Sequence, residues 1–149
     1  LKQQIEKKIS YYDVVADMVD DTALVAGQTA KTNGYYTVND GGQAYYRIYN
    51  NNSLTADGGS VIDLDNGLKA VLLYTTEINI KQFGAKGDGS TDDYSAIQAT
   101  IDFAKSVHID VKVPPTTPFY KVTMPIVLVA DPPTPYNGDA FWSGSDCTL

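Results

Sequence analysis

The feature that most constrains the fold is a glycine- and aspartate-rich stretch, residues 83–93, which lies between a short apolar segment and a helical one. Its three glycines can adopt backbone conformations that other residues avoid, so the stretch predicts a tightly folded loop. The alternating segment before it, 78–82, predicts a strand. Thr91 is predicted as the N-cap of the helix that follows and runs to about Ser106, with acidic residues in the first turn, where the helix dipole favours them.

The predicted helix has one apolar face, and three short strands are predicted after it. One helix face carries small and apolar residues at helical spacing, namely Ala96, Ile97, Thr100, Ile101 and Ala104. After the helix, residues 110–113, 119–123 and 126–129 are rich in β-formers and are separated by prolines, so they predict three more strands.

Between residues 22 and 76 the hydrophobic period changes to two, which predicts a small antiparallel β module. One hairpin is predicted from strands at 34–38 and 44–49 around the turn Asn39-Asp40-Gly41-Gly42. A second is predicted from strands at 60–64 and 68–73 around the turn Asp65-Asn66-Gly67.

Residues 1–21 predict a helix, because apolar residues recur at four-residue spacing with charged residues between them. Such a narrow apolar stripe cannot keep an isolated short helix folded. Two interpretations stay open: a helix packed on its own domain, or the end of a coiled stem that joins identical chains. Three apolar positions are too few for a heptad assignment that would separate them.

The stretch from Ile78 to Leu128 resembles the opening of the pectate-lyase-like right-handed β-helix superfamily. The shared phrase is a strand, a Phe-Gly-Ala-x-Gly-Asp-Gly-x-x-Asp-Asp loop, an Ala-Ile-Gln helix, a Val-Pro-Pro strand end and a Tyr-x-Val-x-x-Pro-Ile-x-Leu pair. Here these are Phe83 to Asp93, Ala96 to Gln98, Val113 to Pro115 and Tyr120 to Leu128. One departure is Thr116-Thr117-Pro118, where members usually carry a glycine before the tyrosine.

The preceding segment, with Gly34-Tyr35-Tyr36, Asp40-Gly41-Gly42 and Tyr46-Arg47-Ile48, is similar to a small module found before such β-helices in phage tailspikes and neck or tail appendage proteins. The two resemblances imply a mainly β chain with an N-terminal stem helix over 1–21 and a small antiparallel β module over 22–76. Over 77–149 they imply a capping helix and the first coil of a right-handed parallel β-helix. Since an open solenoid end exposes an unpaired edge, a helix laid across it would serve as a cap.

The same resemblance implies a virion protein that forms a homotrimer. We expect the N-terminal part to bind phage neck, tail or baseplate proteins, and the distal β-helix to contact host cell-surface polysaccharide. The alternative is a polysaccharide lyase or glycoside hydrolase whose catalytic coils follow this segment. A bacterial surface β-helix protein is a third possibility. On each of these interpretations the sequence is expected to be a piece of a longer chain, because one coil is too few for a stable solenoid.

Composition excludes several other classes. The net charge of −7 and a single arginine, Arg47, argue against a nucleic-acid partner, since phosphate contacts need a basic stripe. No apolar run has the length of a membrane span. Cys147 is the only cysteine, which excludes an internal disulfide framework and a cysteine-based zinc cage.

No catalytic, cofactor-binding or metal-binding residue is predicted, and no cofactor. Asp92 and Asp93 are interpreted as helix-capping charges, because helical neighbours diverge by about 100° and cannot face one glycosidic bond. Residues 88–92 do not fit an EF-hand loop, whose sixth and twelfth positions would be Asp93 and Ala99. His108, the sole histidine, follows the predicted helix end, and no Gly-x-Ser-x-Gly elbow accompanies it.

The remaining candidates are glycine pairs and aromatic residues. The pairs at 41–42 and 58–59 lack the lysine of a phosphate-binding loop. Phe141 and Trp142 are interpreted as part of a strand edge rather than as sugar contacts. Five tyrosines of the β module could stack on sugar rings, but we interpret them as packing residues of half-buried strands: Tyr35, Tyr36, Tyr45, Tyr46 and Tyr49. Because strand neighbours point to opposite faces, each Tyr-Tyr pair is expected to present one ring per side.

Overall fold

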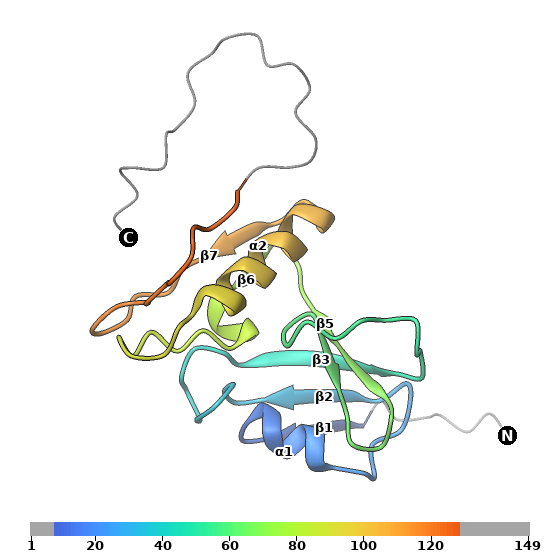
Figure 1. Cartoon of the computed structure of the whole chain (residues 1–149). Helices are drawn as coiled ribbons and strands as arrows, with labels where there is room; N and C mark the ends of the chain where they lie inside the picture. Colours follow the sequence, from blue (N-terminus) through green and yellow to red (C-terminus); the bar gives the residue numbers. More distant parts are fainter. Residues whose placement is uncertain (1–7, 129–149) are drawn as a thin grey trace, which may run out of the picture.

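The computed structural model describes residues 8–128 and is mainly β within that range, as predicted (Figure 1). A five-stranded sheet forms one part, and a second part combines a two-stranded sheet with the longer helix α2. The elements in chain order are β1 (Ile9–Tyr12), α1 (Val15–Asp20), β2 (Thr29–Thr32), β3 (Ala44–Tyr49), β4 (Val61–Asp63), β5 (Lys69–Leu73), β6 (Glu77–Asn79), the 3₁₀ helix η1 (Ile80–Phe83), α2 (Tyr94–Val107) and β7 (Asp110–Lys112). No helix among these is long and apolar enough to cross a membrane.

The larger sheet has the strand order β1-β2-β3-β5-β4, and all its pairs are antiparallel except β1 with β2. The predicted hairpin around the turn 65–67 is confirmed: Val61 pairs with Val71 and Asp63 with Lys69. Gly67 has a φ of 82°, which a residue with a side chain adopts only with strain. The turn residues therefore fix the register that the alternating strands require.

One face of this sheet forms the core. Ala30, Tyr46 and Leu72 lie opposite one another on β2, β3 and β5, and each is at most 2% exposed. Helix α1 contacts β1 and β2 and contributes Val15 and Met18 to the same core. The helix thus shields the apolar face of a sheet that would otherwise be open to water.

The predicted continuous helix over 1–21 is wrong for the part that the structure describes. Residues Ile9–Tyr12 form strand β1, which pairs in parallel with β2, and only Val15–Asp20 is helical. The β-branched and aromatic residues of Ile-Ser-Tyr-Tyr suit an edge strand, and pairing with a neighbouring strand outweighs a weak helical spacing. The apolar pair Val15 and Met18 of the predicted stripe is buried.

The predicted strand at 34–38 is also wrong, because these residues form a loop. Strand β2 lies earlier, at Thr29–Thr32, and pairs antiparallel with β3. The cause is Asp40, whose carboxylate accepts hydrogen bonds from the backbone N–H groups of Tyr35, Tyr36, Thr37 and Gly42. These donors are satisfied inside the loop, so they do not need a neighbouring strand.

In the second part, β6 and β7 pair in parallel and α2 connects them. Helix α2 ends at Val107, close to the predicted Ser106, and buries Ile97, Thr100 and Ala104 on the predicted face. Its N-cap is Asp93 rather than the predicted Thr91, whose N–H instead donates to Asp88 within the loop. The role of α2 as the cap of a β-helix stays a prediction.

The strands predicted at 119–123 and 126–129 do not form within the described residues, which end at 128. Only an isolated parallel bridge between Asp92 and Lys121 is present. Pro118 and Pro125 lack the N–H that a ladder needs, so pairing of this segment is interrupted twice. Six large apolar residues between the end of β7 and residue 128 are exposed: Val113, Phe119, Val122, Met124, Val127 and Leu128.

The two parts share one hydrophobic core. Phe83 of η1, Ile78 of β6 and Ala104 of α2 belong to the same buried cluster as Tyr46 and Leu72 of the larger sheet. Gly59 makes this contact possible, since a Cβ at that position would lie 2.1 Å from an atom of the Phe83 ring. The division into segments 1–21, 22–76 and 77–149 stays a prediction. In the described residues, one hydrophobic core contains side chains from both sides of the boundary between residues 76 and 77.

Candidate functional site

The loop 83–93 follows the 3₁₀ helix η1, and a capping box at the end of β6 starts that helix. The Asn79 side-chain oxygen accepts from the N–H groups of Lys81 and Gln82, and the Gln82 side chain accepts from the Asn79 N–H. The 3₁₀ helix ends at Gly84, whose φ is 91°. A side chain at Gly84 would be strained by that φ and would come within 3.0 Å of the Tyr35 ring. The loop is therefore folded back against the β module.

Asp93 anchors the centre of this loop. Its side chain is 2% exposed and accepts from the N–H groups of Lys86 (2.6 Å) and Gly87 (3.1 Å). Its own N–H donates to the carbonyl of Lys121, so one residue joins the loop, the start of α2 and the segment after β7. A charged group buried in this way is stabilised by the donors that it accepts from.

Asp88 and Asp92 each accept from a separate set of donors. Asp88 binds the N–H and hydroxyl groups of Thr91 and Ser90, and these hydrogen bonds hold the pKa of its carboxyl well below the usual range. Asp92 accepts from the hydroxyl and N–H of Thr123 and from the N–H of Tyr94, which also lowers its pKa. Of the two carboxylates predicted as helix-capping charges, Asp92 does accept from the first N–H of α2, whereas the Asp93 side chain accepts from the loop and makes no capping hydrogen bond to the helix.

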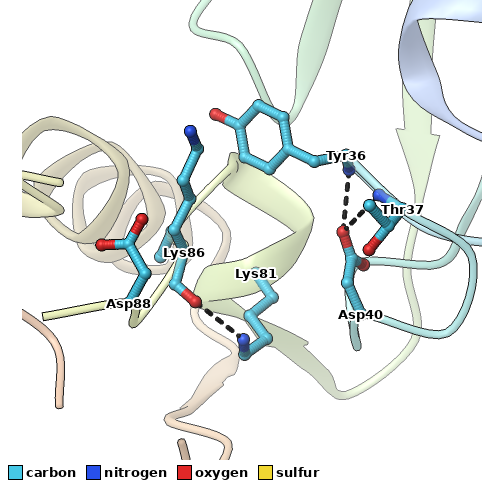
Figure 2. A pocket seen from close by; sticks show the side chains of 7 residues that line it. Tyr36, Thr37, Asp40, Lys81, Lys86 and Asp88 are labelled. Atoms are coloured by element: carbon cyan, nitrogen blue, oxygen red, sulfur yellow. Dashed lines mark hydrogen bonds between the residues drawn. The ribbon is translucent and has the colours of Figure 1, made fainter. Parts of the chain in front are cut away.

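A shallow pocket of about 280 Å³ opens beside this loop, and Figure 2 shows the side chains that line it. The Lys81 ammonium donates to the Lys86 carbonyl (3.1 Å), and the Lys86 ammonium lies 4.8 Å from the centroid of the Tyr36 ring. Burial raises the pKa of the Tyr36 hydroxyl, with smaller contributions from Asp93 and Asp40. The Lys86 ammonium could hold a small anionic or hydroxylated group there, whereas the Lys81 ammonium is bound to the Lys86 carbonyl.

Its carboxylates are already committed to the protein. Partial burial favours the neutral form of Asp40, but the N–H groups of Tyr35, Gly42, Tyr36 and Thr37 outweigh it and lower the Asp40 pKa. Asp88 accepts from its own loop. Neither carboxylate is placed as a proton donor, which is the role that one of the two carboxyl groups has in glycoside hydrolysis. Within residues 8–128 no group of three or more His, Cys, Asp or Glu residues could hold a metal ion.

The other sequence candidates lie apart from this pocket. His108 is the C-cap of α2, with a φ of 57°, and is exposed at the far end of that helix from the loop. The glycine pairs make close packing possible: a Cβ at Gly42 would meet the Lys81 carbonyl and Tyr35, and one at Gly59 would meet Phe83. Phe141, Trp142 and Cys147 lie outside the described residues.

The tyrosines divide between packing and exposure. Tyr46 is fully buried, whereas Tyr45 and Tyr49 are 45% and 47% exposed, so the predicted alternation holds on β3 and the packing interpretation fails for two of its three tyrosines. Tyr35 and Tyr36 lie in the loop before β3, and their rings are 4.7 Å apart rather than on opposite faces. The Tyr35 hydroxyl donates to the Gly58 carbonyl, which ties two loops together.

Known proteins are similar to this chain both in the sequence of the loop and helix region and in the fold. The family model described as rhamnogalacturonase A/epimerase, pectate lyase-like, matches residues 77–126. Alginate lyase 7 of Azotobacter vinelandii is 71% identical over 28 residues, which are 19% of this chain and 3% of that protein. The chain is also similar to the full-length tailspike protein 2 of an Escherichia coli O157:H7 bacteriophage, with 26% identity over 66% of this chain and 13% of that one, at a TM-score of 0.54.

A tailspike protein of the Acinetobacter baumannii bacteriophage Fri1, described as a capsular polysaccharide depolymerase, has the same fold over 70% of this chain and 21% of its own. The TM-score is 0.58 and the identity 22%. These findings confirm the predicted resemblance to tailspikes and to pectate-lyase-like proteins. The chain spans between 3% and 21% of the length of these three proteins.

Proposed function

We propose that this chain is the N-terminal part of a phage tailspike or appendage protein, located in the virion, and that the distal β-helix of the protein recognises host surface polysaccharide. The observation that carries the proposal is the likeness to a full-length tailspike over 66% of the chain, which is more of the chain than the family match at residues 77–126 covers. The core shared by the two parts supports a single unit that holds the start of a β-helix on an attachment module.

The exposed apolar residues after β7 fit this proposal. Val113, Phe119 and Val127 are each about half exposed, although they follow a strand whose neighbours in a solenoid would be stacked coils. A further coil laid on this segment would cover them. Removing such residues from water contributes about 25 cal/mol per Å², so this contact would help to hold a following coil.

The homotrimer is carried over from the resemblance to tailspikes. It does not rest on the predicted helical stem, since Ile9–Tyr12 is a strand. Sedimentation velocity or light scattering on the intact protein should give a trimer. A folded monomer of the intact protein would contradict this part of the proposal. We further propose that neck, tail or baseplate proteins bind the N-terminal part, and that no nucleic acid does.

The alternative is a polysaccharide-degrading enzyme whose catalytic coils follow this segment. It is favoured by one structurally similar tailspike that is described as a capsular polysaccharide depolymerase and by the short match to an alginate lyase. Purified host surface polysaccharide should be incubated with the intact protein and, separately, with this chain. Depolymerisation by the intact protein alone supports the enzyme. Depolymerisation by this chain would contradict the prediction that it carries no catalytic residue.

A further inference from the structure

The outer face of the five-stranded sheet, turned away from the core, carries an unusual density of exposed tyrosine. Tyr11 on β1 is 64% exposed, and Tyr45 and Tyr49 on β3 are 45% and 47% exposed. Their strand neighbours Tyr46 and Ile48 are fully buried on the opposite face. Large rings with this exposure contribute little to the fold, so the face has side chains available for a partner.

The strand registers place four side chains of this face in one row across β1, β2, β3 and β5. Tyr11 pairs with Lys31, Lys31 with Tyr45, and Tyr45 with Leu73. Since neighbouring strands lie about 4.8 Å apart, the two tyrosines of the row are about 10 Å apart. The Lys31 ammonium lies 5.9 Å from the Tyr11 ring centroid and 5.7 Å from that of Tyr45, so a cation is held between two aromatic faces.

The row leads into a hollow. Tyr45 and Leu73 also line a depression of about 410 Å³, together with Tyr74, Thr75, Glu77 and Gln82. The Gln82 amide donates to the Gln43 carbonyl, which orients its side chain at the rim. Aromatic faces beside hydroxyl, amide and carboxylate groups suit a ligand with apolar ring faces and many hydroxyls.

The charge of this face differs from that of the chain. Arg47 lies in the neighbouring row, between Thr29 and Val71, so Lys31 and Arg47 lie on this face in a protein of net charge −7. The one carboxylate in the rows of this sheet face, Asp63, forms a salt bridge with Lys69. Lys31 and Arg47 therefore make the rows of this face complementary to an anion, whereas the hollow beside them carries the Glu77 carboxylate at its lining.

Two cations are too few for nucleic acid, whose binding proteins make several phosphate contacts. We propose that the row Tyr11–Lys31–Tyr45–Leu73 and the hollow beside it bind a carboxylated polysaccharide. Sugar rings stack on Tyr11 and Tyr45, a sugar carboxylate lies against the Lys31 ammonium, and hydroxyls reach the polar rim of the hollow. This site lies on the N-terminal β module and does not depend on the virion role or on the distal coils.

The test measures binding of the 149-residue chain to carboxylated polysaccharides by isothermal titration calorimetry. The probes are alginate, polygalacturonate, hyaluronan and polysialic acid, with neutral dextran as the control. The expected result is binding to at least one carboxylated polymer, weakened by salt, and no binding to dextran. Tyr11→Ser, Tyr45→Ser and Lys31→Gln should each weaken that binding by about tenfold.

The matched control is Phe119→Ser, because the Phe119 ring is 52% exposed and lies after β7, outside the row and both pockets. It should leave the affinity unchanged. The tyrosine and phenylalanine variants replace exposed side chains and Lys31→Gln replaces a half-buried one with a side chain of similar length, so their melting temperatures should stay close to that of the parent. If Tyr45→Ser does not fold, Tyr45→Leu, which keeps apolar area and removes the aromatic face, is the replacement.

Four results would overturn the proposal: no binding to any of the four carboxylated polymers, equal binding to dextran, binding that the face variants do not change, or a loss as large in Phe119→Ser as in Tyr45→Ser. Sedimentation velocity on the same proteins provides one more outcome. If the parent is an oligomer and Tyr45→Ser dissociates it, the face is an interface between copies, which also overturns the proposal.

Discussion

Replacing Asp93 should lower the free energy of unfolding strongly, even though a second aspartate, Asp92, precedes it in the sequence. In Asp93→Ala the N–H groups of Lys86 and Gly87 lose their acceptor, and the Gly87 N–H is in a buried position. A hydrogen bond to a charged group contributes about 1.5–3 kcal/mol. Losing two of them should lower the free energy of unfolding by about 4 kcal/mol, a large part of the roughly 5–15 kcal/mol of an ordinary domain.

Asp93→Asn separates charge from shape. Its amide keeps one acceptor oxygen and turns an NH₂ group toward the second backbone donor, so it should cost about 2 kcal/mol. The matched control is Asp102→Asn on the exposed face of α2, where the carboxylate accepts from the Gln98 amide one turn away. Such a surface pair contributes only about 0.2–0.5 kcal/mol.

The assay is urea denaturation followed by far-ultraviolet circular dichroism, with hydrogen exchange of individual amides. In Asp93→Ala, the Gly87 amide should lose its protection in the native state, while amides of β3 keep theirs. The reasoning is refuted if Asp93→Ala and Asp102→Asn have the same free energy of unfolding and Gly87 stays protected. That result would mean that the loop is held by its glycines and not by the buried carboxylate.

Three further predictions concern stability. Tyr46 has a buried hydroxyl without a hydrogen-bond partner among the described residues, so Tyr46→Phe should raise the melting temperature by about 3 °C; a fall of that size would reveal a partner. Gly59→Ala should cost about 3 kcal/mol in urea denaturation because its Cβ meets the Phe83 ring, against about 1–2 kcal/mol for Gly67→Ala, which has open space and a positive φ; equal costs would argue against the close contact. The fold lowers the Asp40 pKa, so the unfolded chain binds protons first and the free energy of unfolding should fall as pH drops below about 4; in Asp40→Asn this fall should be shallower, and an identical pH profile would contradict the assignment.

The sequence predicted elements correctly where local signals agree with tertiary contacts. The hairpin at 65–67 forms because a turn residue with positive φ lies between two alternating strands that share one buried face. Helix α2 forms as predicted because its buried face faces the core from end to end. In both cases propensity, hydrophobic period and packing lead to the same structure.

The errors at 34–38 and at 9–12 have a common cause, which is hydrogen bonding that propensity does not describe. The β-forming run Gly34–Val38 becomes a loop because the Asp40 carboxylate binds the donors that a strand would offer. Residues Ile9–Tyr12 become a strand because β2 offers an edge to which they can pair. Neither contact is apparent from the local pattern. The acceptor in the loop is the side chain of Asp40, and β2 is distant in the sequence from Ile9–Tyr12.

The candidate site shows the same division. Alternation on β3 predicts which tyrosine of the pair 45–46 is buried, and the structure exposes the other. The pocket beside the loop could not be predicted, because Tyr36, Lys81 and Lys86 are brought together by a backbone reversal at Gly84. The only available signal was the Asn-Asp-Gly-Gly run, which predicts a turn but not the loop that Asp40 organises.

The central claim is that this chain is the virion-proximal part of a tailspike or appendage. The most direct test is electron microscopy of purified phage particles labelled with gold-tagged antibodies against residues 22–76. The account predicts label at the appendage end nearest the particle, with the distal end unlabelled. Label at the distal tip, or particles that carry the protein nowhere, would contradict it.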